Sequence, residues 1–86
     1  MQEFDLTGDQ IRAARGALGW SVKRLAAESG VGSATIVRYE EQTATPQSRK
    51  DNLLKIKHVF ESAGIEFIGD AGEGPGVRLW SKSNQS

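Results

Sequence analysis

The spacing of apolar residues along the chain changes once, near residue 64. Before it, apolar side chains recur every three or four positions, which is typical of helices with one buried face. After it they alternate with polar residues, in Ile65–Ile68 and in Val77–Trp80, which predicts two strands. The segment between these strands is rich in glycine and predicts a turn. The chain is therefore expected to be mainly α, with four helices and a C-terminal two-stranded β-hairpin.

Capping residues and glycines divide the helical part into four segments. The clearest signal is the capping box of Thr7 and Gln10, in which each side chain bonds the backbone of the other. Each expected helix is bounded by a residue that starts it and a residue that ends it. The first three helices are bounded by Thr7 and Gly19, by Ser21 and Gly30, and by Ser33 and Glu41. The fourth starts at Thr45–Pro46 or at Ser48 and ends at Gly64. The side chains expected to share one core are Ile11, Ala14, Leu18, Leu25, Val31, Ile36, Tyr39, Leu53, Ile56 and Phe60.

The second and third helices have the features that two short helices need to cross at a large angle. Ala26 is small where the next helix presses on the first, and Gly30 accepts the positive φ of a tight turn. Ser29 stands where an apolar residue would be more usual. The pattern predicts a helix-turn-helix.

With its flanking helices, this segment resembles the phage-repressor and Cro-like (XRE-type) helix-turn-helix family of transcriptional regulators. The resemblance covers roughly residues 6–63. It rests on Ile11-Arg-Ala-Ala-Arg15, Gly19-Trp-Ser21, Leu25-Ala26, Gly30-Val31, Ala34-Thr-Ile36 and Tyr39-Glu40. It implies a DNA-binding domain in residues 1–64. The alternating pattern adds a hairpin in residues 65–80 that packs on that domain or forms a dimer, and the polar residues 81–86 are expected to be a flexible tail.

The resemblance also implies how the chain would contact double-stranded DNA. The third helix would lie in the major groove and read base edges through Ser33, Ala34, Thr35 and Arg38. Arg38 is the strongest candidate, because its guanidinium can bind guanine O6 and N7 together. The residues expected at phosphates are Val22, Lys23, Arg24, Gln42, Thr43 and Thr45. Val37 could face either the core or the groove.

Arg15 and Glu40 are expected to form a structural ion pair, as the resemblance implies. Arg15 shares a helical face with Ile11 and Leu18, where an arginine is unusual unless it has a partner. This structural role is favoured over a DNA contact.

Charge leaves two interpretations open. The formal net charge is zero, with 11 basic and 11 acidic residues. Residues 11–58, however, hold nine bases against four acids, a balance of +5. This excess either forms one basic face for DNA or is scattered over the surface. Val22 and Glu41 stand where relatives of this kind often have DNA-contacting polar residues. The alternative function is therefore an adaptor or antitoxin-like module that keeps the fold with weak or no DNA binding.

Several other functions are disfavoured. The chain has no cysteine, and its single histidine, His58, has no second ligand at helical spacing, so neither metal nor cofactor is expected. No Ser/His/Asp order or paired carboxylates indicate an enzyme. No apolar run approaches a membrane span, and the acidic start does not resemble a signal peptide. We expect a cytoplasmic protein without a small-molecule effector, since no segment remains for an effector domain.

The hairpin raises the question of what covers it. A two-stranded ribbon is marginal alone, so it either packs back on the fourth helix or pairs with a second copy. Regulators of this kind usually bind two half-sites as dimers. The hypothesis is a homodimer with Ile68 and Trp80 in or beside the interface, while Trp20 belongs to the core.

Overall fold

The computed structural model of the chain describes residues 6–42, 50–69 and 74–80. The elements are, in chain order, α1 (Gly8–Leu18), α2 (Val22–Ser29), α3 (Ser33–Glu40), α4 (Lys50–Ser62), β1 (Ile65–Ile68) and β2 (Gly76–Leu79). The two strands form one antiparallel sheet. The mainly α architecture with a C-terminal hairpin is thus confirmed.

Most helix ends lie where the caps predict them. The Thr7 hydroxyl accepts from the Gln10 N–H at 3.0 Å, and the Gln10 side chain accepts from the Thr7 N–H at 3.0 Å, which completes the capping box. Gly19 and Gly30 end α1 and α2 in the left-handed conformation, with φ of 70° and 79°. Ser21 caps α2.

The expected N-cap of α3 was wrong, whereas the expected bounds of about Ser33 to Glu41 lie within one residue of the observed helix. Gly32, not Ser33, is the N-cap, and it provides no side-chain hydrogen bond. Ser33 is the first helical residue, and Glu41 lies just beyond the end as the C-cap. The expected start of α4 at Thr45–Pro46 or Ser48 lies outside the described residues.

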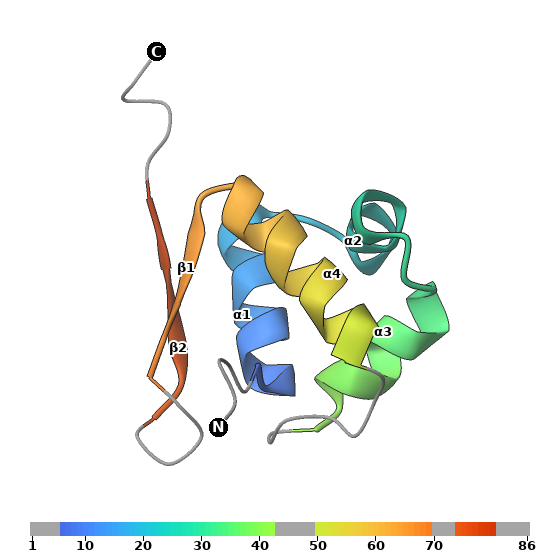
Figure 1. Cartoon of the computed structure of the whole chain (residues 1–86), viewed down its shortest axis with the longest axis horizontal. Coiled ribbons are helices and arrows are strands. Elements are labelled where there is room, and N and C mark those ends of the chain that lie inside the picture. Colours follow the sequence, from blue (N-terminus) through green and yellow to red (C-terminus); the bar gives the residue numbers. More distant parts are fainter. Residues whose placement is uncertain (1–5, 43–49, 70–73, 81–86) are drawn as a thin grey trace.

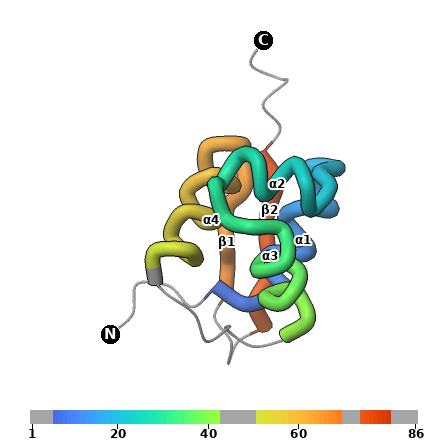
Figure 2. The backbone as a smooth tube through the Cα atoms, turned by 90° about the vertical axis from the view of Figure 1, so that its right-hand side faces the viewer, coloured from blue at the N-terminus to red at the C-terminus, as the bar shows by residue number. Residues whose placement is uncertain are grey.

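The elements form three layers. In Figure 1, α1 and α4 occupy the middle, the hairpin covers them on one side, and α2 and α3 lie on the other. Figure 2 views the molecule from the α2–α3 side, with the strands behind the helices. The helix-turn-helix and the hairpin are therefore at opposite ends of the molecule, which leaves the outer surface of α3 clear of the hairpin.

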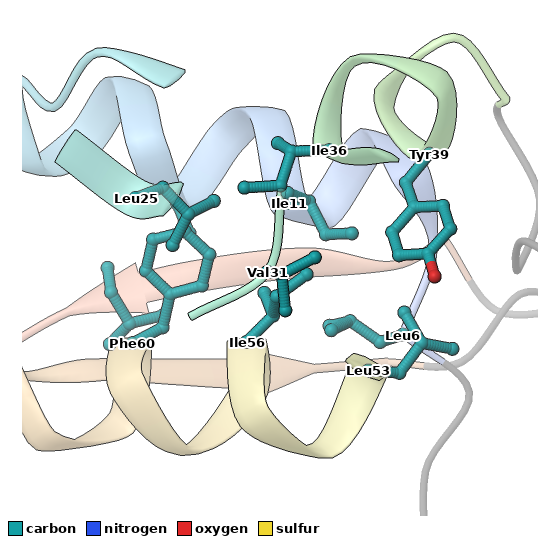
Figure 3. Close-up of a cluster of buried hydrophobic side chains, with 11 residues drawn as sticks. Leu6, Ile11, Leu25, Val31, Ile36, Tyr39, Leu53, Ile56 and Phe60 are labelled. Atoms are coloured by element: carbon teal, nitrogen blue, oxygen red, sulfur yellow. The ribbon is translucent and has the colours of Figure 1, made fainter. Parts of the chain in front are cut away.

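The core lies between the helices, and each of the four contributes to it (Figure 3). Its largest fully buried side chains include Tyr39 and Phe60, from α3 and α4. Phe60 also stacks on the partly buried Trp20 and meets the edge of Phe67, with ring centres 5.8 and 6.1 Å apart. Burial of each large apolar side chain contributes roughly 1.5–3 kcal/mol. This aromatic chain joins the α1–α2 junction, α4 and β1 in one core, as expected for Trp20.

The hairpin packs on the helices with one face only. Phe67 pairs with Val77, and both pack against the core, whereas Glu66 pairs with Arg78 on the outer face. Directly opposed residues of an antiparallel pair point to the same side. β2 lies along α1, and β1 contacts α4. The ribbon is therefore held chiefly by the first helix, where the sequence suggested the fourth.

Gln10 connects the start of α1 to the hairpin. Its buried side chain donates from Nε2 to the carbonyl oxygens of Ile68 and Gly76, at 3.3 and 3.0 Å, at the point where the strands meet the turn. Its Oε1 meanwhile accepts from Thr7 in the capping box. One amide thus completes a helix cap and anchors the hairpin.

Gly8 brings the start of α1 against the end of α3. A Cβ atom at residue 8 would lie 2.0 Å from the Gln42 carbonyl oxygen and 2.2 Å from that of Tyr39. Both are backbone atoms, which no side-chain rotation can move away. Glycine is therefore required here by the close approach of two chain segments.

Gly8→Ala is expected to destabilise the fold by about 2 kcal/mol or more, because α1 and α3 must separate to admit the methyl group. Gly16→Ala is the matched control on the same helix, where an added Cβ meets nothing within 4 Å. It should stabilise the protein by roughly 0.5–1 kcal/mol through helix propensity. Chemical denaturation of both variants measures the difference, and a neutral Gly8→Ala variant would contradict the close approach.

Candidate nucleic-acid interface

The turn between α2 and α3 is built around Gly30 and Ser29. The Gly30 N–H donates to the Ala26 carbonyl at 2.9 Å and ends α2. The Ser29 hydroxyl donates to the Leu25 carbonyl at 2.8 Å and accepts from the Val31 N–H at 3.1 Å. Ser29 therefore gives the Val31 N–H an acceptor that an apolar side chain could not provide.

Helix α3 has one buried and one exposed face. Ile36, Tyr39 and Glu40 are buried, and the Tyr39 hydroxyl accepts from Asn52 Nδ2 at 3.1 Å. Thr35 is half-buried at the border between the two faces. The exposed face consists of Ser33, Ala34, Val37, Arg38 and Glu41, where Glu41 is the C-cap. Of the expected base readers, three are thus exposed, and Val37 faces outward and not into the core.

Glu40 joins α3 to α1 through its side chain and its backbone. Arg15 Nε and Nη2 donate to Glu40 Oε2 and Oε1, each at 2.9 Å, which is a two-point ion pair. Arg15 Nη1 also donates to the Trp20 carbonyl at 3.0 Å, and Arg12 donates to the Glu40 carbonyl. Only 8% of the Glu40 side chain and 23% of the Arg15 side chain are exposed. The end of α3 is therefore fixed in position by two arginines of α1.

The ion pair also affects the protonation of Arg15. Its hydrogen bonds to the Glu40 carboxylate raise the pKa of Arg15 above its ordinary value, although burial acts in the opposite direction. Since arginine is already protonated at every pH at which proteins are folded, the guanidinium remains charged.

The start of α2 offers backbone donors. Ser21 accepts from the N–H groups of Arg24 and Leu25 through its hydroxyl and its carbonyl, at 2.9 and 3.1 Å. The helix itself provides no acceptor for the N–H groups of Val22 and Lys23. The Val22 side chain packs against the core, while that of Lys23 is exposed. Of these two residues, only Lys23 can bring a charge to a ligand there.

Arg24 lies apart from the other candidates. Its guanidinium is 4.6 Å from the Trp20 ring centre, and its Nε donates to Glu28 Oε2 at 2.8 Å. These three side chains line a surface hollow between α2 and α4, to which α3 contributes no residue. Arg24 is thus already engaged with Trp20 and Glu28, at a surface that α3 does not share.

The remaining candidates are divided between the α3 terminus and the hairpin. Gln42 Nε2 donates to the Arg38 carbonyl at 3.4 Å. Thr43 and Thr45 lie outside the described residues. Ile68 and Trp80 are 36% and 56% exposed on the hairpin. In Figure 1 the hairpin lies on the other side of α1 and α4 from α2 and α3.

The comparison with protein families identifies the domain. The model of a helix-turn-helix family, that of the XRE-type regulators, matches residues 11–59, more than half of the chain. The chain belongs to this helix-turn-helix family. No curated protein matches the chain. Membership supports a DNA-binding regulator and confirms the resemblance seen in the motif from Ala26 to Glu40.

The described residues contain neither a cluster of metal-ligating side chains nor a membrane-spanning helix. Within residues 6–42, 50–69 and 74–80, no three side chains of His, Asp or Glu are grouped as a metal site would require. Across the same ranges, no helix is long and apolar enough to cross a membrane.

Three contacts of this helix-turn-helix protein were not predicted from the sequence: the approach at Gly8, the Arg12 bond to the Glu40 carbonyl, and the Gln10 bonds to the hairpin. For the first of these contacts the sequence did offer a signal, because Gly8 lies inside the first helical turn, where glycine is unfavourable unless packing requires it. The other two depend on backbone carbonyls of distant segments, which no side-chain pattern reveals.

Arg15→Ala is expected to lower stability by about 3 kcal/mol, because it leaves the Glu40 carboxylate buried without its cation. The melting temperature should fall by more than roughly 10 °C. DNA binding, measured well below that temperature, should be affected less than stability.

The double variant Arg15→Met with Glu40→Met is the matched control, since replacing both charges with apolar groups removes the uncompensated charge. It should recover much of the lost stability. An Arg15→Ala variant that kept its melting temperature and lost DNA binding would instead place Arg15 at the DNA.

Proposed function

We propose that this protein is a transcription regulator that binds specific double-stranded DNA sequences, with α3 in the major groove. The observation that carries the proposal is the exposed face of α3. It presents Arg38 on a helix whose opposite face is fixed by Ile36, Tyr39 and the Arg15–Glu40 pair. A rigid helix with an outward arginine is what base recognition requires. Such a regulator would act in the cytoplasm.

Arg38 is assigned to a guanine, because its planar guanidinium can donate to O6 and N7 at once. Ser33 and Thr35 can donate to base edges or to phosphates near the start of α3. Ala34, one turn before Arg38, offers a methyl group instead of a hydrogen bond. These four residues form the proposed reading surface.

Phosphate contacts are assigned to the start of α2 and the end of α3. The N–H groups of Val22 and Lys23 point out of the helix N-terminus, where the helix dipole favours an anion. The Lys23 side chain adds a charge at the same end, and Gln42 extends from the end of α3. Thr43 and Thr45 remain candidates from the sequence. Arg24 would first have to leave Glu28 and Trp20.

Selection of bound sites from random duplexes tests the whole proposal. Enrichment of one motif is expected, with a log affinity that falls steeply and linearly with log salt. An absence of enrichment, together with no salt-dependent binding to random duplexes, would overturn it.

Arg38→Ala should cost about 1–3 kcal/mol on the selected site and relax the preference at one base position. Lys23→Ala should weaken binding to cognate and random duplexes alike, and lower the salt slope by about one. Affinities measured on both duplexes at several salt concentrations separate the two roles. Equal losses for both variants on both duplexes would show that Arg38 does not read a base.

Charge favours a second candidate function, a protein-interaction adaptor or antitoxin-like module. Four of the nine bases in residues 11–58, Arg12, Arg15, Arg24 and Lys57, form ion pairs with neighbouring acids. Glu41 also adds an exposed carboxylate at the end of α3. These pairs reduce the field that would attract DNA. An adaptor would show little duplex binding at any salt concentration.

We further propose a homodimer formed through the outer face of the hairpin. Ile68 and Trp80 lie at opposite ends of that face. Between them the Glu66 carboxylate accepts from Trp80 Nε1 at 2.9 Å and from Arg78 Nη1 at 3.1 Å. A two-fold axis that passes near Glu66 and Arg78 would bring Trp80 against Ile68 of the partner subunit. It would also keep both α3 helices uncovered.

Sedimentation at micromolar concentration is expected to detect this dimer, and Trp80→Ala should shift the equilibrium towards monomer. Leu54→Ala is the matched control, since Leu54 is 46% exposed and belongs to α4, not to the hairpin. The outer face of this short ribbon offers less area than the ~800 Å² that each partner buries in a standard interface. We therefore expect a dimer dissociation constant in the micromolar range. A persistent monomer that Trp80→Ala does not change would refute the hairpin interface.

A further inference from the structure

The exposed face of α3 contains an apolar residue that the domain itself does not use. Val37 is 44% exposed, although its neighbour Ile36 is fully buried. An exposed valine lowers helix propensity and leaves its methyl groups in water. Since it contributes nothing to the core, its position next to Arg38 points to a role in binding.

We infer that Val37, together with Ala34, contacts the C5-methyl group of a thymine beside the guanine that Arg38 reads. The inference rests on the proposed function and adds a second element of the DNA sequence. The thymine methyl group is the one apolar group that a base pair presents in the major groove. An apolar side chain on a groove-facing helix therefore has one chemically matched target.

Helix geometry places the guanine contact of Arg38 close to the thymine contact of Val37 and Ala34. Ala34 and Val37 are three residues apart, and Ala34 and Arg38 four, so all three lie on adjacent turns of one face. Side chains at these spacings are about 5–6 Å apart. Successive bases of one strand rise by about 3.4 Å. The thymine is therefore expected within two base steps of the guanine.

The same contact would disfavour other bases at that position. Cytosine presents an N4 amino donor, which Val37 would bury without an acceptor, at a cost in binding. Uracil keeps the O4 acceptor of thymine and lacks only the methyl group. Deoxyuridine is thus the substitution that isolates the contact.

The experiment uses the full chain and the duplex obtained by site selection, with each thymine replaced in turn by deoxyuridine. At one thymine, wild-type affinity should fall about three- to fivefold, the effect of one buried methyl group. Val37→Ala should bind the thymine duplex more weakly and lose most of this discrimination. The two substitutions together form a double-mutant cycle with a coupling close to the single effect.

Leu54→Ala is the control, because it removes an equally exposed apolar side chain from α4 and should leave the deoxyuridine effect unchanged. Circular dichroism checks that Val37→Ala remains folded. Failure to select any site would overturn the proposed function and this inference together. A selected site at which no thymine responds to deoxyuridine, or at which Val37→Ala keeps the full response, would overturn the inference alone.

Discussion

The position of α3 depends on the two arginines of α1 that hold Glu40. Arg15 neutralises the carboxylate, which is 8% exposed, and Arg12 donates to the carbonyl of the same residue. A carboxylate this deeply buried would be costly without its partner. Because both donors come from one rigid helix, α3 has little freedom to rotate about its own axis. The face that α3 presents outward is thus decided by a contact on its opposite side.

The approach at Gly8 adds a steric constraint at the same junction. The start of α1 lies against the carbonyls of Tyr39 and Gln42, so the two helices meet at backbone distance. Packing, charge and hydrogen bonding then all favour the same position of α3 against α1. Such consistency is how a small domain specifies a single structure. The residues left outside this junction, Arg38 and Val37 among them, are available for recognition. The contacts that stabilise the fold and the proposed recognition surface thereby lie on opposite faces of one short helix.

The hairpin is joined to this framework by another residue of α1. Gln10 donates to the carbonyls of Ile68 and Gly76, while Phe67 and Val77 close the apolar side of the ribbon over the helices. A two-stranded ribbon is marginal alone, so these contacts account for its position. Its outer face points away from α3 in Figure 1. An interface there and a DNA contact at α3 would not compete for the same surface.

The sequence by itself determined the order of the helices, the caps of α1 and α2, and the helix-turn-helix, because caps, glycines and apolar periodicity act locally. It also indicated Arg15 and Glu40 as partners, through an arginine on an apolar face together with the family resemblance. Only the tertiary structure decided that Val37 faces outward and that Arg24 lies against Trp20 and Glu28. It alone placed the hairpin along α1. These outcomes depend on which distant surfaces meet, and a one-dimensional pattern contains the period of a helix but not the partner against which each face packs.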